Sequence, residues 1–152
     1  MKQIFYSILL LATISISAVA QDSTIYTKDG VALEVRDTGN NTLVELSRAD
    51  SIFNFNVAVA KFLPGKKLDW HYHPGGQILI ITEGVGYYQE RGKLKRIVRK
   101  GEVVKCLPGV EHWHGSSVET GVTYLATSPA QRGATVWLEK VTDEQYNSKT
   151  NK

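Results

Sequence analysis

Residues 70–84 read WHYHPGGQILIITEG, and this stretch decides the fold. His71 and His73 stand two residues apart, and residues with this spacing point to the same face of an extended strand. Pro74-Gly75-Gly76 then predicts a turn, and the apolar run that follows Gln77 predicts a new strand. Two imidazoles on one face provide half of a transition-metal site.

The same spacing returns later in the chain. There are four histidines, and the other two, His112 and His114, lie in the stretch PGVEHWHG. Trp70, Tyr72 and Trp113 alternate with the histidines, so we expect these aromatic rings to face the opposite side and pack the sheet. Two pairs with one spacing predict a single site that both pairs build.

The first 20 residues are typical of an export signal rather than of folded structure. Lys2 gives a positive start, residues 4–16 are mostly apolar, and Ala18-Val19-Ala20 fits a cleavage site. The apolar run is shorter than the ~20 residues that a membrane-spanning helix needs. We therefore expect cleavage before Gln21 and one mature domain, 21–152, in the bacterial periplasm or secreted, without membrane association.

Composition excludes several classes of protein. Cys106 is the only cysteine, so the chain cannot form an internal disulfide and its core must hold the fold. Lys and Arg outnumber Asp and Glu by only 18 to 15, which is too small an excess to indicate a nucleic-acid partner. The basic run at 91–105 is interpreted as a solvated hairpin.

Short apolar segments separated by turns predict an all-β fold. Residues 53–60 alternate with the two-residue period of a strand, and 141–146 predict a helical turn capped at Thr142. On the first segment, Ala58 and Ala60 lie opposite the large apolar side chains and are candidates to line a pocket. The regular spacing predicts a small antiparallel sandwich or barrel. Further strands are expected at 24–27, 31–35, 43–46, 68–73, 77–82, 86–90, 94–98, 103–107, 112–114, 122–126 and 135–138.

The histidine-bearing stretches resemble the two motifs of the cupin superfamily. The first motif, G-x5-H-x-H-x3-E-x6-G, is matched with every spacing kept by Gly65, His71, His73, Gln77 and Gly84. The second motif, G-x5-P-x-G-x2-H, is matched by Gly101, Leu107, Gly109 and His112. Gln77 replaces the glutamate and Leu107 the proline. The resemblance implies a cupin conserved β-barrel, a double-stranded β-helix of the jelly-roll type, with its core at about 53–128 and a strand and helical tail at 135–146.

The runs HPGGQ, EGVGYYQERG, PGVEHWHG and WLEKVTDEQY are similar to those of manganese-dependent cupin hydroxynitrile lyases and of carboxymuconolactone-decarboxylase-associated cupins. The resemblance implies that a metal is held by three histidines and a glutamine, and that the next histidine moves a proton. It makes His114 the catalytic candidate. The ligands that it implies are His71, His73, Gln77 and His112.

Ligand chemistry is compatible with this assignment. Three imidazoles suit several divalent metals and do not choose among them. The resemblance makes manganese the first expectation, with iron, nickel and zinc as alternatives. Gln77 binds through a neutral carbonyl oxygen, which leaves the metal more positive than a glutamate would and strengthens it as a Lewis acid. Four protein ligands on an octahedral ion leave two positions open, which is typical of a catalytic site.

His114 has alternatives that the pattern leaves open. As a neighbour of a ligand, it is suited to acid-base work, because imidazole titrates near neutral pH. It could instead orient a ligand or be a packed core histidine, or it could bind the metal in place of Gln77.

Three functions remain. The first is a lyase acting on a small molecule, with cyanohydrin or aldol-like C–C chemistry. The others are a cupin-type dioxygenase or isomerase, and a module that binds a sugar acid without turnover. Fold alone cannot choose among them. Because small barrels often pair their edge strands with another subunit, we also expect a homodimer.

Overall fold

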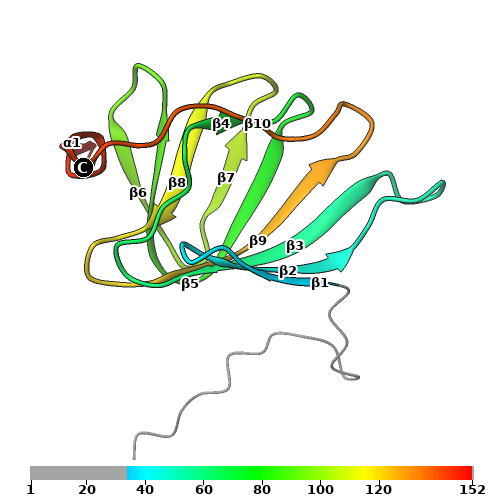
Figure 1. The fold of residues 1–152 in the computed structure, drawn as a ribbon, viewed down its shortest axis with the longest axis horizontal. Helices are drawn as coiled ribbons and strands as arrows, with labels where there is room; N and C mark the ends of the chain where they lie inside the picture. Colours follow the sequence, from blue (N-terminus) through cyan, green and yellow to red (C-terminus); the bar gives the residue numbers. More distant parts are fainter. Residues whose placement is uncertain (1–33, 152) are drawn as a thin grey trace, which may run out of the picture.

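The computed structural model describes residues 34–151 of the chain. The expected signal segment 1–20, the cleavage before Gln21 and the strand at 24–27 lie outside the described residues. Strands dominate the described part, and they form a sheet that curls around an interior (Figure 1). The elements, in order, are β1 Glu34–Asp37, β2 Thr42–Ser47, β3 Phe55–Phe62, β4 His71–Tyr72, β5 Gln77–Glu90, β6 Lys95–Arg99, β7 Val103–Cys106, β8 His112–Ser116, β9 Val122–Pro129, β10 Val136–Trp137, α1 Asp143–Tyr146 and β11 Thr150–Asn151.

The strands run in the order β1-β2-β3-β9-β5-β8-β4-β10, with β7, β6 and β11 off this path. Their pairings are antiparallel, except that β11 joins β6 in parallel. The first half of β5 pairs with β7 and β9, and its second half pairs with β6 and β8. The predicted all-β fold is confirmed.

One continuous strand, β5, replaces the two that were expected at 77–82 and 86–90, so the break expected between them was wrong. The backbone of Gly84 has φ 73°, a conformation that favours glycine. A Cβ at this position would lie 1.9 Å from the carbonyl oxygen of Gly121. The glycine thus lets β5 continue past β9 and into its pairing with β6 and β8. The strand expected at 68–73 is also shorter, and only His71–Tyr72 forms β4.

Two apolar clusters hold the barrel. The larger one lies inside and includes Phe62, Leu79, Ile81 and Val104. The second consists of Trp70, Trp113, Val141 and Tyr146. Trp70 and Trp113 are therefore packed away from the histidines, as predicted, while Tyr72 is half-buried. Cys106 is a buried free thiol in the larger cluster.

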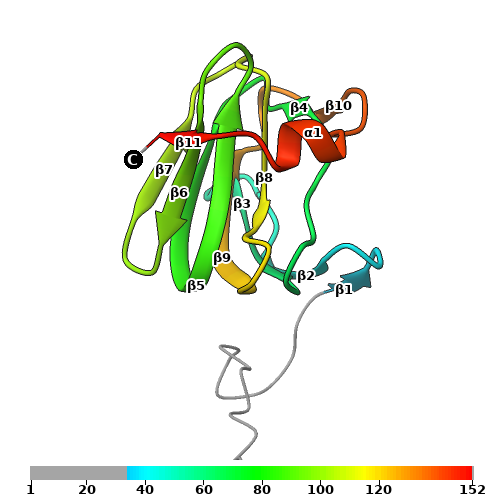
Figure 2. The same ribbon diagram turned by 90° about the vertical axis from the view of Figure 1, so that its left-hand side faces the viewer.

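The second cluster attaches the C-terminal segment to the barrel. Helix α1 begins with the predicted cap, in which the Thr142 hydroxyl accepts from Gln145 N and the Gln145 side chain accepts from Thr142 N. The buried Lys95 ammonium donates to the carbonyl of Tyr146 and lies 4.1 Å from the Tyr87 ring centre. Helix α1 lies at the same end of the molecule as β4 and β10 (Figure 2). No helix in residues 34–151 is long and apolar enough to span a membrane.

Candidate metal centre

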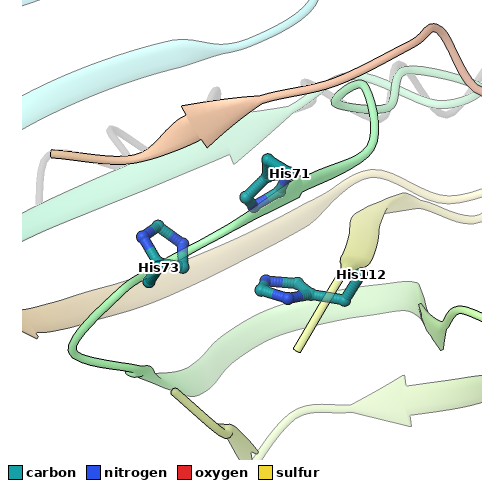
Figure 3. Close-up of side chains that lie close together, drawn as sticks. All are labelled: His71, His73 and His112. Atoms are coloured by element: carbon teal, nitrogen blue, oxygen red, sulfur yellow. The ribbon is translucent and has the colours of Figure 1, made fainter. Parts of the chain in front are cut away.

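Three of the four histidines converge on one point. His71 in β4 is directly opposite His112 in β8 in the strand register, and His73 follows β4 by one residue. One ring nitrogen from each residue lies within 4.8 Å of the other two (Figure 3). All three rings are buried. The three histidines could therefore hold a metal ion, as three of the four expected ligands.

Backbone carbonyls just before β4 and β8 orient two of these rings. His71 Nδ1 lies 2.8 Å from the carbonyl oxygen of Asp69, and His112 Nδ1 lies 2.8 Å from that of Val110. A carbonyl only accepts, so Nδ1 carries the proton in both rings. The Nε2 lone pair is then free to bind a metal, in the tautomer that ligating histidines commonly take.

A distant segment orients the third ring. The Thr135 hydroxyl lies 3.1 Å from His73 Nδ1. Two residues later, the Trp137 ring lies 4.9 Å from the His71 ring, centre to centre, because β10 pairs with β4. Residues 135–138 were expected to form a strand, but no sequence signal placed Thr135 and Trp137 beside the histidines.

Buried polar atoms without partners mark the same point. Gln77 Oε1, His73 Nε2, His112 Nε2 and His114 Nε2 have no hydrogen bond within the described chain. Leaving a buried polar group unpaired costs about 1–3 kcal/mol, so four in one place require an explanation. The nitrogens of His73 and His112 and the carbonyl oxygen of Gln77 are suitable donors for a divalent transition metal, and His71 completes the histidine group, so the residues fit the expected ion.

His114 is set apart from the other three. It is buried, but it is not part of the group whose nitrogens lie within metal-binding distance of one another. Its Nδ1 lies 2.6 Å from the Tyr124 hydroxyl, and its ring centre is 5.0 Å from that of His71. The ring thus borders the metal centre while its far side is held by Tyr124, a contact that the sequence did not indicate.

Burial keeps the histidines neutral. Desolvation, with a smaller effect of the neighbouring His112, lowers the pKa of His71 to about 3 and that of His73 to about 4. Burial also lowers the pKa of His112, and it holds that of His114 well below its ordinary value. Neutral imidazole is the form that binds metal, so His71, His73 and His112 are ready for a cation at neutral pH.

The histidines open onto a cavity of about 350 Å³. Its polar floor includes His71, His73, Gln77 and His114. The space remains open because small side chains line it. Ala60 lines this cavity and Ala58 lines the adjoining pocket, as predicted from their positions on the strand. Its apolar wall is made by Leu43, Ala60, Leu68, Ala126 and Trp137. The volume is near the lower end of the ~300–1,000 Å³ that ligand sites occupy, so it suits a small molecule.

Comparisons with known proteins agree with this architecture. A cupin domain family model matches residues 58–127. The chain is 44% identical over 90 residues to an (R)-mandelonitrile lyase of Granulicella tundricola, a match that covers 59% of this chain and 69% of that protein. Among solved structures, it is similar to a cupin-like protein of Thermotoga maritima, with TM-score 0.68, 37% identity and coverage of 77% of this chain and 92% of the other.

A more distant neighbour shows the fold alone. It is a conserved protein with a double-stranded β-helix domain from Klebsiella pneumoniae, with TM-score 0.60 and 21% identity, and the match covers 78% of this chain and 100% of the other. The family match, the relative and the geometry of the three histidines are consistent with one another. This chain belongs to the cupin superfamily and resembles its hydroxynitrile lyases.

Proposed function

We propose that this protein is a manganese-dependent lyase that cleaves or forms a C–C bond next to a hydroxyl or carbonyl group in a small molecule. One observation carries the proposal: an unpaired histidine nitrogen, His114 Nε2, borders the metal centre and lines the same cavity. The 44% identical relative, named as an (R)-mandelonitrile lyase, indicates the reaction class.

The expected ligands are His71, His73, Gln77 and His112. The unpaired Oε1 of Gln77 supports its inclusion. When bound, the ion would act as a Lewis acid on a substrate oxygen, and the neutral amide of Gln77 would leave its positive charge undiminished.

His114 is assigned the proton transfer. The Tyr124 hydroxyl can either donate to Nδ1 or accept from it, so Nε2 can carry a proton or a lone pair. During cleavage of a cyanohydrin, Nε2 would take the hydroxyl proton as the C–C bond breaks and deliver it to the departing cyanide. The hydroxyl-bearing carbon leaves as an aldehyde, so protons and charges balance.

The cavity walls supply the rest of the site. Leu43, Leu68 and Trp137 surround the space above the histidines with apolar surface. Such walls exclude water from the reacting group and strengthen the hydrogen bonds made inside. They also favour a substrate with an apolar body.

The proposal is tested by loading the purified mature chain with Mn²⁺ and measuring benzaldehyde release from mandelonitrile. Oxygen uptake is followed in the same samples, and metal-loaded His114→Ala protein is the control. We expect benzaldehyde release by the parent, far less by the variant, and no oxygen consumption. Oxygen uptake without cleavage would indicate a dioxygenase, and ligand binding without turnover would indicate a binding protein.

Export and a homodimer belong to the same proposal. Ile78, Ile80 and Val103 are exposed on the outer face of β5 and β7, where a second copy could pack. N-terminal sequencing of the native protein should start at Gln21, and light scattering should give twice the mass of one chain. An uncleaved N-terminus or a monomer at high concentration would contradict these points.

A further inference from the structure

The chain has three tryptophans, and one of them differs from the other two in its exposure. Trp70 and Trp113 are 3% and 0% exposed in the second cluster, whereas Trp137 is 56% exposed. Packing explains the first two positions, because a buried indole stabilises the core. An exposed indole that borders a cavity of ligand size is instead placed where a bound molecule would cover it.

Strand pairing holds Trp137 at the histidine cavity. Trp137 is the Cα partner of His71 in the pairing of β10 with β4, and the two strands lie side by side (Figure 1). The centre of its ring lies 4.9 Å from that of His71, and the ring lines the same cavity. Leu138 N donates to the carbonyl of Trp70, and Trp70 N donates to that of Glu139, so the backbone on this side is fixed. The indole is thus a positioned planar surface beside an expected metal ligand.

The wall that continues from the indole is apolar. Leu43, Ala60 and Tyr124 are Cα partners in consecutive strand pairs, so their side chains lie on one face of the sheet. That face is the interior, and all three residues line the cavity together with Leu68. An apolar group that lies against Trp137 therefore enters a space from which apolar side chains exclude water.

Two polar residues of the β1–β2 turn line the cavity and are paired with each other. The Thr38 hydroxyl donates to Asn41 Oδ1 at 2.6 Å, and Asn41 N donates to Thr38 Oγ1 at 3.2 Å. Because these groups bond within the turn, this part of the lining favours a ligand whose body needs no polar partner there.

A different role for Trp137 is to support His71 by packing against its ring. Support of that kind depends on the volume of the side chain and affects every ligand equally. Discrimination between an aromatic and a saturated ligand of similar size depends on the π-face of the indole. The two roles are therefore separated by binding measurements on paired ligands.

We propose that Trp137 selects the substrate by stacking against a planar aromatic group next to the hydroxyl- or carbonyl-bearing carbon. This inference rests on the proposed function for the reacting group at the metal centre. Aromatic rings attract one another at centre separations of about 4.5–7 Å, in addition to the effect of apolar burial. Trp137 also lies outside residues 58–127, which the cupin family model matches and which contain His71, His73 and His112. The selecting residue thus comes from a different segment than the histidines.

The test is calorimetric binding of two neutral probes, mandelamide and its cyclohexyl analogue hexahydromandelamide, to the Mn²⁺-loaded mature chain. The probes have the same hydroxyl and amide groups and differ in whether the ring is aromatic. Apolar burial alone favours the cyclohexyl probe, which has more apolar surface. We expect the parent instead to prefer mandelamide about two- to tenfold, Trp137→Phe to keep this preference and Trp137→Leu to lose it. Leu94→Ala, which shortens an exposed side chain outside this cavity, should bind both probes like the parent.

Intrinsic fluorescence gives an independent readout, because Trp137 is the exposed one of the three tryptophans. Acrylamide should quench its emission in the Mn²⁺-loaded parent, and saturating mandelamide should reduce that quenching. Trp137→Phe protein, which has the two buried tryptophans, should show little quenching with or without the probe. Quenching of the parent that mandelamide does not change would contradict the proposal.

Equal affinity of the parent for both probes, or a preference that survives in Trp137→Leu, would overturn the inference. A Trp137→Leu protein that loses Mn²⁺ and both probes together would also overturn it, because Trp137 would then support His71. These results do not depend on turnover. A preference that requires Trp137 in a protein that never cleaves mandelonitrile would refute the lyase proposal alone. Cleavage of mandelonitrile, with a probe preference that Trp137→Leu leaves unchanged, would refute the role of Trp137 alone.

Discussion

The two His-x-His pairs have the same spacing, and the first histidine of each pair is held in the same way. His71 and His112 each donate Nδ1–H to a backbone carbonyl two residues earlier, at 2.8 Å in both cases. The second histidine of each pair is held by a hydroxyl group from a distant strand or segment. Thr135 contacts His73, and Tyr124 contacts His114. In each pair, one ring is therefore held by a backbone carbonyl two residues away, and the other by a hydroxyl group that only the folded structure brings close.

The pairs differ in how many rings reach the metal centre. The first pair supplies two rings, while the second supplies His112 only. Strand β8 pairs with both β5 and β4, whereas β4 has two residues and His73 already belongs to the turn that follows. The carbonyl of His73 instead accepts backbone hydrogen bonds from Gly76 N and Gly109 N, which fix the chain after β4, whereas the paired backbone of β8 keeps His114 beside Tyr124. Identical motifs acquire different roles because their strands are constrained differently.

The largest effect is expected from removing a locally anchored histidine. His112→Ala should weaken Mn²⁺ binding by more than ~100-fold, because it deletes a ligand, whereas loss of an outer partner alone costs 10–100-fold. His71→Ala should do the same. Metal content of the purified variants and calorimetric titration measure the effect, with His114→Ala as the control that keeps its metal. Full metal occupancy in a His71→Ala, His112→Ala double variant would place the metal elsewhere.

The next effect separates the two members of the second pair. His114→Ala should retain the metal and lose ~10²–10⁴-fold in kcat, which is the usual contribution of a positioned acid-base group. Substrate affinity should change much less, because the ligands are untouched. The assay is benzaldehyde release by metal-loaded protein. A metal-free His114→Ala protein, or one as active as the parent, would show that this histidine has another role.

The hydroxyl group of Thr135, which contacts His73, should govern metal affinity. Thr135→Val removes the hydroxyl beside His73 and should weaken Mn²⁺ binding ~10–100-fold, while Thr135→Ser should stay close to the parent. Thr127→Val makes the same substitution in β9 and is the matched control. Metal affinity that does not change in Thr135→Val would mean that His73 needs no partner from the C-terminal segment.

Gln77→Glu tests whether the amide belongs to the ligand set. A carboxylate in its place should keep or tighten metal binding and lower kcat roughly tenfold, because the added negative charge weakens the ion as a Lewis acid. Gln89→Glu serves as the control, because Gln89 accepts a hydrogen bond from Trp113 in the second cluster. An unchanged kcat together with unchanged metal affinity would place Gln77 outside the ligand set.

The smallest effect is expected at Tyr124, whose hydroxyl group contacts His114. Tyr124→Phe deletes one hydrogen bond to His114, worth about 1 kcal/mol, and should lower kcat about three- to tenfold without metal loss. Tyr87→Phe, which packs against the C-terminal segment, should leave kcat unchanged. A Tyr124→Phe enzyme with lost metal would instead indicate that this contact supports the ligands.

Local pattern determined much of the protein. The period of two in the strands and the turn residues predicted a small all-β sandwich or barrel, and the resemblance of the histidine-bearing stretches to the cupin motifs implied a site that unites His71, His73 and His112. They also predicted the cap of α1 and the outward packing of Trp70 and Trp113. These features depend on residues close together in the chain, and backbone geometry then dictates which side chains share a face.

Only the tertiary structure decided the remaining features. Gly84 keeps β5 continuous because the strand must pass close to Gly121, a contact between segments far apart in sequence. Thr135 and Tyr124 reach the histidine site for the same kind of reason, through strand pairing and register. The spacing of two histidines depends only on neighbours along one strand, whereas the hydroxyl groups around this centre come from segments that meet only when the sheet curls closed.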